Sequence, residues 1–115
     1  MAEPNPEELV LLGIKSYEKQ DFSKAKGYFE KACDLNNGGG CNGLGVLYRD
    51  GQGAEKNLTK ASQYFSKACD LNNNKGCFNL GALYLEKDSK KAVALFEKAC
   101  KLGYKKACEM LKELR

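Results

Sequence analysis

The sequence predicts an all-α protein, an α/α superhelical solenoid of about three helical-hairpin repeats that ends in a C-terminal helix. Three observations predict it. The pattern Phe-x-Lys-Ala-Cys recurs with its cysteine at Cys33, Cys69 and Cys100. A second cysteine follows each of these after eight residues, and apolar residues recur at helical spacing. We expect a single repeat domain over residues 1–115, with units at about 7–37, 38–73 and 74–103 and a last helix at 104–115.

The second helix of each unit shows the clearest signals. Asp21, Asn57 and Asp88 each stand four residues before an alanine that begins an apolar stripe. Such side chains accept hydrogen bonds from the first turn of a helix, so we expect the helix to begin at each of them. The stripes are Ala25, Tyr28, Phe29, Ala32 and Leu35; Ala61, Tyr64, Phe65, Ala68 and Leu71; and Ala92, Leu95, Phe96, Ala99 and Leu102.

The first helix carries the pattern Leu-Gly-x-x-Tyr at residues 44–48 and 80–84. A glycine inside a helix costs about 1 kcal/mol relative to alanine, so its recurrence indicates a close approach of two helices. Counting back from Tyr17 places Gly13 at the leucine position and Ile14 at the glycine position. We therefore expect an atypical terminal repeat, as is common in such arrays.

The chain is expected to close with a helix from Tyr104 to Leu114 that turns Ala107, Leu111 and Leu114 inward. Within the units, the two helices are joined differently. Unit two has a glycine-containing loop over residues 49–56, whereas units one and three turn through residues 19–21 and 86–88. The loop is not a phosphate loop, because no strand precedes it and no Gly-Lys-Ser/Thr follows.

Composition excludes several classes of function. The chain has no histidine, which removes histidine general bases and Ser-His-Asp triads. The longest apolar run, residues 9–12, is far shorter than a membrane span of about 20 residues. The whole net charge of +4 lies in residues 86–115, where lysine and glutamate alternate along helical stretches. That pattern is typical of a solvated helix face and not of a nucleic-acid interface.

The six cysteines form three pairs with one spacing. In each of the first two pairs, a glycine- and asparagine-rich segment lies between the two cysteines. The first cysteine of a pair therefore ends one helix and the second begins the next. So short a link brings the side chains of antiparallel neighbours within disulfide reach, and each closure is worth about 2.5 kcal/mol. Only one connectivity follows the repeat. We predict the disulfides Cys33–Cys41, Cys69–Cys77 and Cys100–Cys108.

We predict no metal site and no cofactor, because zinc sites space cysteines by about two to four residues and commonly add histidine. Disulfides indicate an oxidising compartment, so we expect a secreted or periplasmic protein. Residues 1–4 show neither the basic nor the apolar segment of a signal peptide. We therefore expect the sequence to be the mature part of an exported protein, with a starting methionine added.

The Leu-Gly-x-x-Tyr pattern, the helix ending Phe-x-Lys-Ala-Cys-Asp-Leu and the paired cysteines resemble the Sel-like repeat family, which is related to tetratricopeptide repeats. They are most similar to the secreted Helicobacter cysteine-rich proteins. The resemblance covers about residues 7–115, and residues 50–57 look like the family's inter-helix loop. It implies an α/α superhelix with one disulfide per unit, export, and a role in host interaction and immune recognition. For some members it also implies penicillin binding and slow β-lactam hydrolysis.

In such a superhelix the first helices line the concave surface, where we expect a protein or peptide ligand. The amide of Asn42 can bond a peptide backbone, and the guanidinium of Arg49 can pair with a carboxylate. The alternative is that these are ordinary polar residues of an exposed helix. We expect a monomer with no nucleic-acid partner and no membrane insertion. The candidate peptide-binding residues are Lys15, Asn42, Val46, Arg49, Phe78, Asn79, Ala82 and Leu85.

The alternative functions are a penicillin-binding protein with slow β-lactamase activity and an engineered or consensus scaffold without a ligand. The Ser-x-x-Lys pattern of β-lactamases occurs at residues 16–19 and 23–26. The sequence lacks the partner motifs Ser-Asp-Asn and Lys-Thr-Gly. We expect Ser16 and Ser23 to face solvent, and we predict no catalytic residue.

Overall fold

Capping side chains define where the helices begin in the computed structural model, which describes residues 4–114. The side-chain oxygens of Asp21, Asn57 and Asp88 accept hydrogen bonds from first-turn backbone N–H groups, which confirms the predicted starts of the second helices. Residues 1–3 and Arg115, the last residue of the expected C-terminal helix, lie outside the described residues. The helices are α1 (Pro6–Glu18), α2 (Phe22–Asp34), α3 (Gly38–Asp50), α4 (Leu58–Asp70), α5 (Asn74–Tyr84), α6 (Ser89–Lys101) and α7 (Lys105–Leu114).

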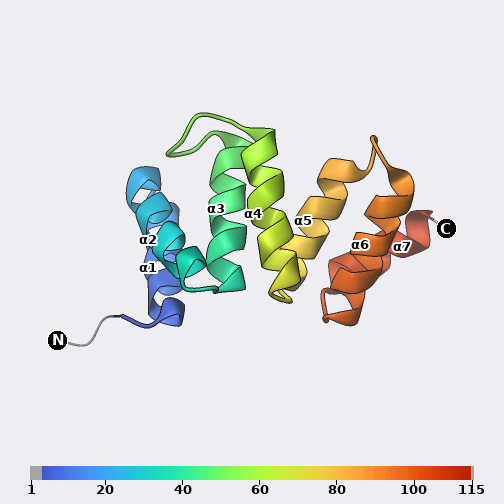
Figure 1. Ribbon diagram of the computed structural model, residues 1–115, viewed down its shortest axis with the longest axis horizontal. Coiled ribbons are helices and arrows are strands. Elements are labelled where there is room, and N and C mark those ends of the chain that lie inside the picture. Colours follow the sequence, from blue (N-terminus) through green and yellow to red (C-terminus); the bar gives the residue numbers. More distant parts are fainter. Residues whose placement is uncertain (1–3, 115) are drawn as a thin grey trace.

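The helices stack in chain order along the long axis of a molecule that measures 51 × 28 × 21 Å (Figure 1). Besides the pairs that follow one another in the chain, α1 packs on α3 and α3 packs on α5. The helices α2, α4 and α6 do not pack against one another to the extent that α1, α3 and α5 do. The first helices of the units therefore form an inner layer and the second helices an outer one. This arrangement confirms the predicted α/α solenoid.

The two turns between units share one backbone conformation. Asn36 and Asn72 adopt left-handed backbone angles, with φ of 62° and 63°, at the end of α2 and α4. Asn37 and Asn73 then cap α3 and α5 through bonds to the third residue of each helix. The three predicted disulfides are confirmed, with Cα–Cα distances of 4.6, 4.5 and 4.9 Å in chain order.

A glycine and a phenylalanine meet in the core of each unit. A β-carbon on Gly45 would stand 2.5 Å from the ring of Phe65, and one on Gly81 would stand 2.9 Å from the ring of Phe96. These positions confirm the close helix approach expected from the repeated glycine. The ring fits only because the helix surface opposite it carries no side chain.

Unit one follows the same rule, which corrects the predicted register. A β-carbon on Gly13 would stand 2.5 Å from the ring of Phe29, so Gly13 occupies the glycine position and not the leucine position. Ser16 then takes the place that Tyr48 holds in unit two, and it is buried. Tyr17, from which the register was counted, instead packs edge-on against Phe22.

Three leucines expected in the core are exposed. Leu35, Leu71 and Leu114 retain 52%, 37% and 41% of their accessible surface. Leu35 and Leu71 are the C-caps of α2 and α4, where the backbone leaves the helix and the apolar stripe no longer continues. Leu114 lies in the last turn of α7. By contrast, Ala107 and Leu111 of α7 are buried as predicted.

The loop between α3 and α4 reaches toward α2 (Figure 1). Gly53 has a φ of 72°, and a β-carbon there would stand 2.5 Å from the carbonyl oxygen of Phe22. Ala54 packs against the core that α2, α3 and α4 share. The loop therefore covers the junction between units one and two. Unit three has only a short turn at this point, in which Asp88 bonds back to the carbonyl of Tyr84.

Candidate functional site

Two asparagines join neighbouring units across the inner layer. The Asn79 side-chain nitrogen donates to the Asn42 side-chain oxygen over 2.9 Å, although the residues lie 37 positions apart. Asn42 belongs to α3 and Asn79 to α5, and both side chains are half-buried. The structure therefore brings together two of the candidate residues. Neither side chain was expected to bond to the other.

A small apolar hollow lies between α1 and α3. Its volume is about 210 Å³, and its floor is the ring of Phe29. The hollow exists because Gly43 carries no side chain, since a β-carbon there would stand 2.9 Å from that ring. Val46, a candidate residue, lies in its wall. The lining residues are Ile14, Tyr17, Phe29, Gly43 and Val46.

Lys15 does not lie with this group, which corrects its assignment. With Gly13 at the glycine position, the next residue, Ile14, takes the place that Val46 holds in unit two. Lys15 is exposed and corresponds to Leu47 of α3. Ile14 retains 43% of its surface and lines the hollow. Aligning the units on their glycines, and not on Tyr17, would have identified it.

Two further candidates are held by contacts within the protein. Both oxygens of the Asp50 carboxylate accept hydrogen bonds from the Arg49 guanidinium, over 3.0 and 3.2 Å. That guanidinium also lies 6.0 Å from the centre of the Phe65 ring. Phe78 is buried and packs against the rings of Phe96 and Tyr104, with centroids 5.3 and 5.1 Å away. Phe78 is therefore part of the core.

The last two candidates, Ala82 and Leu85, line a different space. They lie in the wall of a groove between α4 and the end of α5, opposite Leu58 and Thr59. This groove continues along α4 toward α6. The structure therefore places Val46 at the inner hollow and Ala82 and Leu85 at a groove beside α4, and it does not gather the candidate residues into one site.

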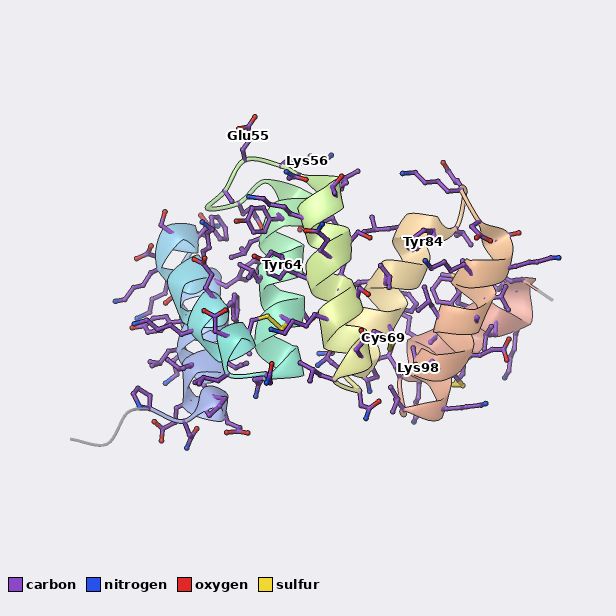
Figure 2. All side chains as sticks on the ribbon, viewed as in Figure 1. Glu55, Lys56, Tyr64, Cys69, Tyr84 and Lys98 are labelled. Carbon is purple, nitrogen blue, oxygen red and sulfur yellow. A yellow bond between two sulfur atoms is a disulfide. The ribbon has the colours of Figure 1, made fainter. Side chains whose placement is uncertain are left out.

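Tyr84, which lines this groove, lies beside a charged lysine. The Lys91 ammonium lies 4.2 Å from the centre of the Tyr84 ring. Its hydrogen bond to the phenol, with a smaller contribution from Ser62, lowers the pKa of Tyr84. Figure 2 shows Tyr84, Cys69 and Lys98 between α4 and α6. Farther along the molecule, burial raises the pKa of Tyr64, and the neighbouring Tyr48 adds to the effect.

The two Ser-x-x-Lys serines have different surroundings. Ser16 is buried, and its hydroxyl donates to the Leu12 carbonyl oxygen over 2.9 Å. This corrects the expectation that it faces solvent, and the cause is its position opposite α2. Ser23 is exposed, as predicted. A hydroxyl bonded to its own helix is poorly placed to act as a nucleophile.

Two other structural features are absent from residues 4–114. No group of three or more cysteine, aspartate or glutamate side chains is arranged there to hold a metal ion. In the same residues, no helix combines the length and the apolar character needed to cross a membrane.

The chain is similar to known repeat proteins in sequence. The Sel1 repeat model matches residues 10–37, 39–73 and 75–104. HcpC of Helicobacter pylori is 66% identical over 58 residues, which are 50% of this chain and 20% of HcpC. Beta-lactamase HcpA of the same species is 57% identical over 58 residues, 50% of this chain and 23% of HcpA. The matched stretch thus spans about a fifth of these relatives.

Solved structures extend the similarity to most of the chain. Helicobacter pylori cysteine-rich protein B superposes with a TM-score of 0.73 at 36% identity, over 92% of this chain and 94% of that one. A Sel1 repeat protein from Oxalobacter formigenes superposes with a TM-score of 0.87 at 25% identity, over 93% of this chain and 47% of that one. The arrangement of the helices is therefore that of a known architecture.

Proposed function

This chain belongs to the Sel1 repeat family, and on that premise we propose that it is an exported, disulfide-stapled module that binds a protein or peptide on its inner face. One observation carries the proposal. The apolar hollow is lined from α3 by Gly43 and Val46, and Asn42 of the half-buried amide pair lies next to Gly43 in the same helix. Sites that recognise peptides combine an apolar pocket for a side chain with fixed polar groups for the backbone.

The chemistry of the pair suits a peptide group. One amide hydrogen of Asn79 and the oxygen of Asn42 bond to each other. The Asn42 nitrogen can then donate to a peptide carbonyl, and the Asn79 oxygen can accept from a peptide N–H. An aliphatic side chain of the same peptide would enter the hollow between Ile14 and Val46 and cover the edge of Phe29. Each buried methylene contributes about 0.8 kcal/mol.

Location outside the cytoplasm is part of the proposal. Three disulfides at repeat spacing are typical of proteins that fold in oxidising compartments. The similarity to Helicobacter pylori cysteine-rich proteins supports the same location. A host protein is the partner that we propose for such a module.

The test uses oxidised protein to select binders from a displayed random-peptide library. Selected peptides should carry an aliphatic residue, and their Kd should rise at least about tenfold for Ile14→Asp, which places a charge in the hollow. Leu35→Asp is the control, because Leu35 is also an exposed aliphatic residue but lies outside the hollow. Unchanged binding by Ile14→Asp would remove the inner-face proposal.

A β-lactam-directed activity is the second candidate, and its support is the similarity to beta-lactamase HcpA. The buried hydroxyl of Ser16 argues against Ser16 as its nucleophile. Purified protein should be incubated with a chromogenic β-lactam beside a Ser16→Ala, Ser23→Ala variant. Turnover that the variant lacks would assign the activity to these serines, and turnover that it keeps would exclude them.

A further inference from the structure

The two junctions between units differ at equivalent positions, and each difference opens the second junction. In the first junction, between α2 and α4, the ring of Tyr64 stacks on Tyr48 with centroids 5.6 Å apart. Leu95 stands at the equivalent of Tyr64 in unit three, beside Tyr84, the equivalent of Tyr48. The first junction is therefore filled by an aromatic side chain that the second junction lacks.

The side chains that line the second junction are also smaller than those that line the first. Lys26 and Glu30 form an ion pair over 3.9 Å on α2, and their equivalents on α4 are Ser62 and Ser66. The long loop that covers the first junction is replaced by the short turn before Asp88. Smaller side chains and a missing loop leave a space between α4, α5 and α6.

This space is a continuous groove beside α4. One part, about 540 Å³, lies between α4 and α6, and a second part, about 590 Å³, lies between α4 and the end of α5. The two parts share Ser62, Gln63 and Tyr84. Leu80 and Leu95 lie in the first part, so apolar and polar side chains line it together. Its length follows α4 from Leu58 to Asp70, which is about 18 Å at 1.5 Å per residue.

Basic and acidic side chains both line the groove. Lys91 and Lys98 line it from α6, with Asp70 at one end and Glu86 near the other, beside Lys87. Lys67, the equivalent of Lys98 in the first junction, instead donates to the carbonyl oxygen of Cys33 over 3.1 Å. In the second junction the equivalent lysine, Lys98, instead lines the groove.

We propose that the groove between α4 and α6 binds a peptide segment of about five to six residues, in the polyproline II conformation, whose carboxylates pair with Lys91 and Lys98. These lysines lie seven residues apart on one helix, or about 10.5 Å along its axis. In a polyproline II segment, which has three residues per turn and rises about 3.1 Å per residue, side chains three residues apart lie on the same face and about 9 Å apart. The hydroxyls of Ser62 and Ser66 are placed to bond the peptide backbone. This site is separate from the inner-face hollow and does not depend on it.

The probe is the hexapeptide acetyl-Ala-Glu-Leu-Ala-Glu-Ala-amide, titrated into ¹⁵N-labelled oxidised protein and followed by amide chemical shifts. Shifts should concentrate on α4 and α6, and its glutamine counterpart should bind at least about fivefold more weakly because it lacks the charges. Leu95→Tyr reinstates the aromatic residue of the first junction and should weaken binding about tenfold or more. Lys98→Gln should weaken it about fivefold, whereas Lys24→Gln, an exposed lysine on α2, should leave it unchanged.

Four outcomes would overturn the proposal. Shifts that do not lie on α4 and α6, or that persist in Leu95→Tyr with unchanged affinity, would exclude the groove. Equal binding of the glutamine peptide would exclude recognition of carboxylates. Saturation of the same resonances by inorganic phosphate at equal affinity would show a simple anion site and not a peptide site. Because Ile14→Asp leaves the groove intact, it should bind the hexapeptide normally, which separates this proposal from the inner-face one.

Discussion

The ring of Phe65 lies against Gly45 so closely that a β-carbon on the glycine would stand 2.5 Å from ring atom Cε1. The same relationship joins Gly13 to Phe29 in the preceding unit. Each second helix thus inserts a phenylalanine into the glycine notch of the first helix. The contact explains why a residue that weakens an isolated helix recurs in the middle of these.

Substituting two helical glycines should change stability in opposite directions. Gly45→Ala should lower the free energy of unfolding by about 1–3 kcal/mol, because the ring and its surroundings must shift. Gly27→Ala on α2 should raise it by about 0.5–1 kcal/mol, since an added β-carbon meets nothing within 4 Å. Urea denaturation of both oxidised variants measures the difference. Two changes of the same sign would contradict the glycine-notch account.

The Asn42–Asn79 bond should couple neighbouring units. Asn42→Ala and Asn79→Ala should each cost about 1 kcal/mol, because each leaves a half-buried amide without its partner. In a double-mutant cycle, the double variant should cost less than the sum of the two by about 0.5–1 kcal/mol. Chemical denaturation of the four proteins gives the coupling energy. Strict additivity would show that the bond contributes nothing between units.

The three disulfides should be reduced in a definite order. Cys100 and Cys108 are half-buried, whereas the four cysteines of the other two pairs retain at most 3% of their surface. Thiol–disulfide exchange requires access of an attacking thiolate to a sulfur atom, so the Cys100–Cys108 bond should open first. Limited dithiothreitol, iodoacetamide trapping and peptide mass spectrometry would identify the labelled pair. Initial labelling of Cys33 or Cys69 would contradict the prediction.

Two tyrosines should titrate on opposite sides of the ordinary value of 10.0. The Lys91 ammonium favours the phenolate of Tyr84 and lowers its pKa, whereas burial favours the neutral phenol of Tyr64 and raises its pKa. In absorbance titrations at 295 nm, Tyr84→Phe should remove the early part of the curve and Tyr64→Phe the late part. Lys91→Gln should shift the Tyr84 transition to higher pH.

These shifts have opposite consequences for stability. A lowered folded-state pKa stabilises the protein above the ordinary value, and that contribution of Tyr84 is lost as the pH falls through its folded pKa. A raised folded-state pKa stabilises it below the ordinary value, so the contribution of Tyr64 is lost as the pH rises through its folded pKa. Unfolding curves of Tyr84→Phe and Tyr64→Phe between pH 9 and 11 should therefore diverge from the wild type with opposite slopes. Parallel curves would contradict these assignments.

Local chemistry was sufficient for the architecture. The helix starts at Asp21, Asn57 and Asp88, the disulfide pairing and the order of elements all depend on interactions within about ten residues of chain. Such interactions leave a direct trace in spacing and residue type. The inner face of the first helices was also predictable, because stacked hairpins place equivalent helices in one layer.

What the sequence could not decide was which side chains meet across units. The register of unit one, and with it the choice of Ile14 over Lys15, depended on where Phe29 packs, because a single glycine is matched to its ring only in three dimensions. Phe78 lies in the core and not on the expected binding surface, because its ring packs against Phe96 and Tyr104. The open groove arose from Leu95 standing where a tyrosine fills the other junction. Repeat patterns determine each hairpin, whereas the surfaces available to a partner depend on packing between hairpins that are distant in sequence.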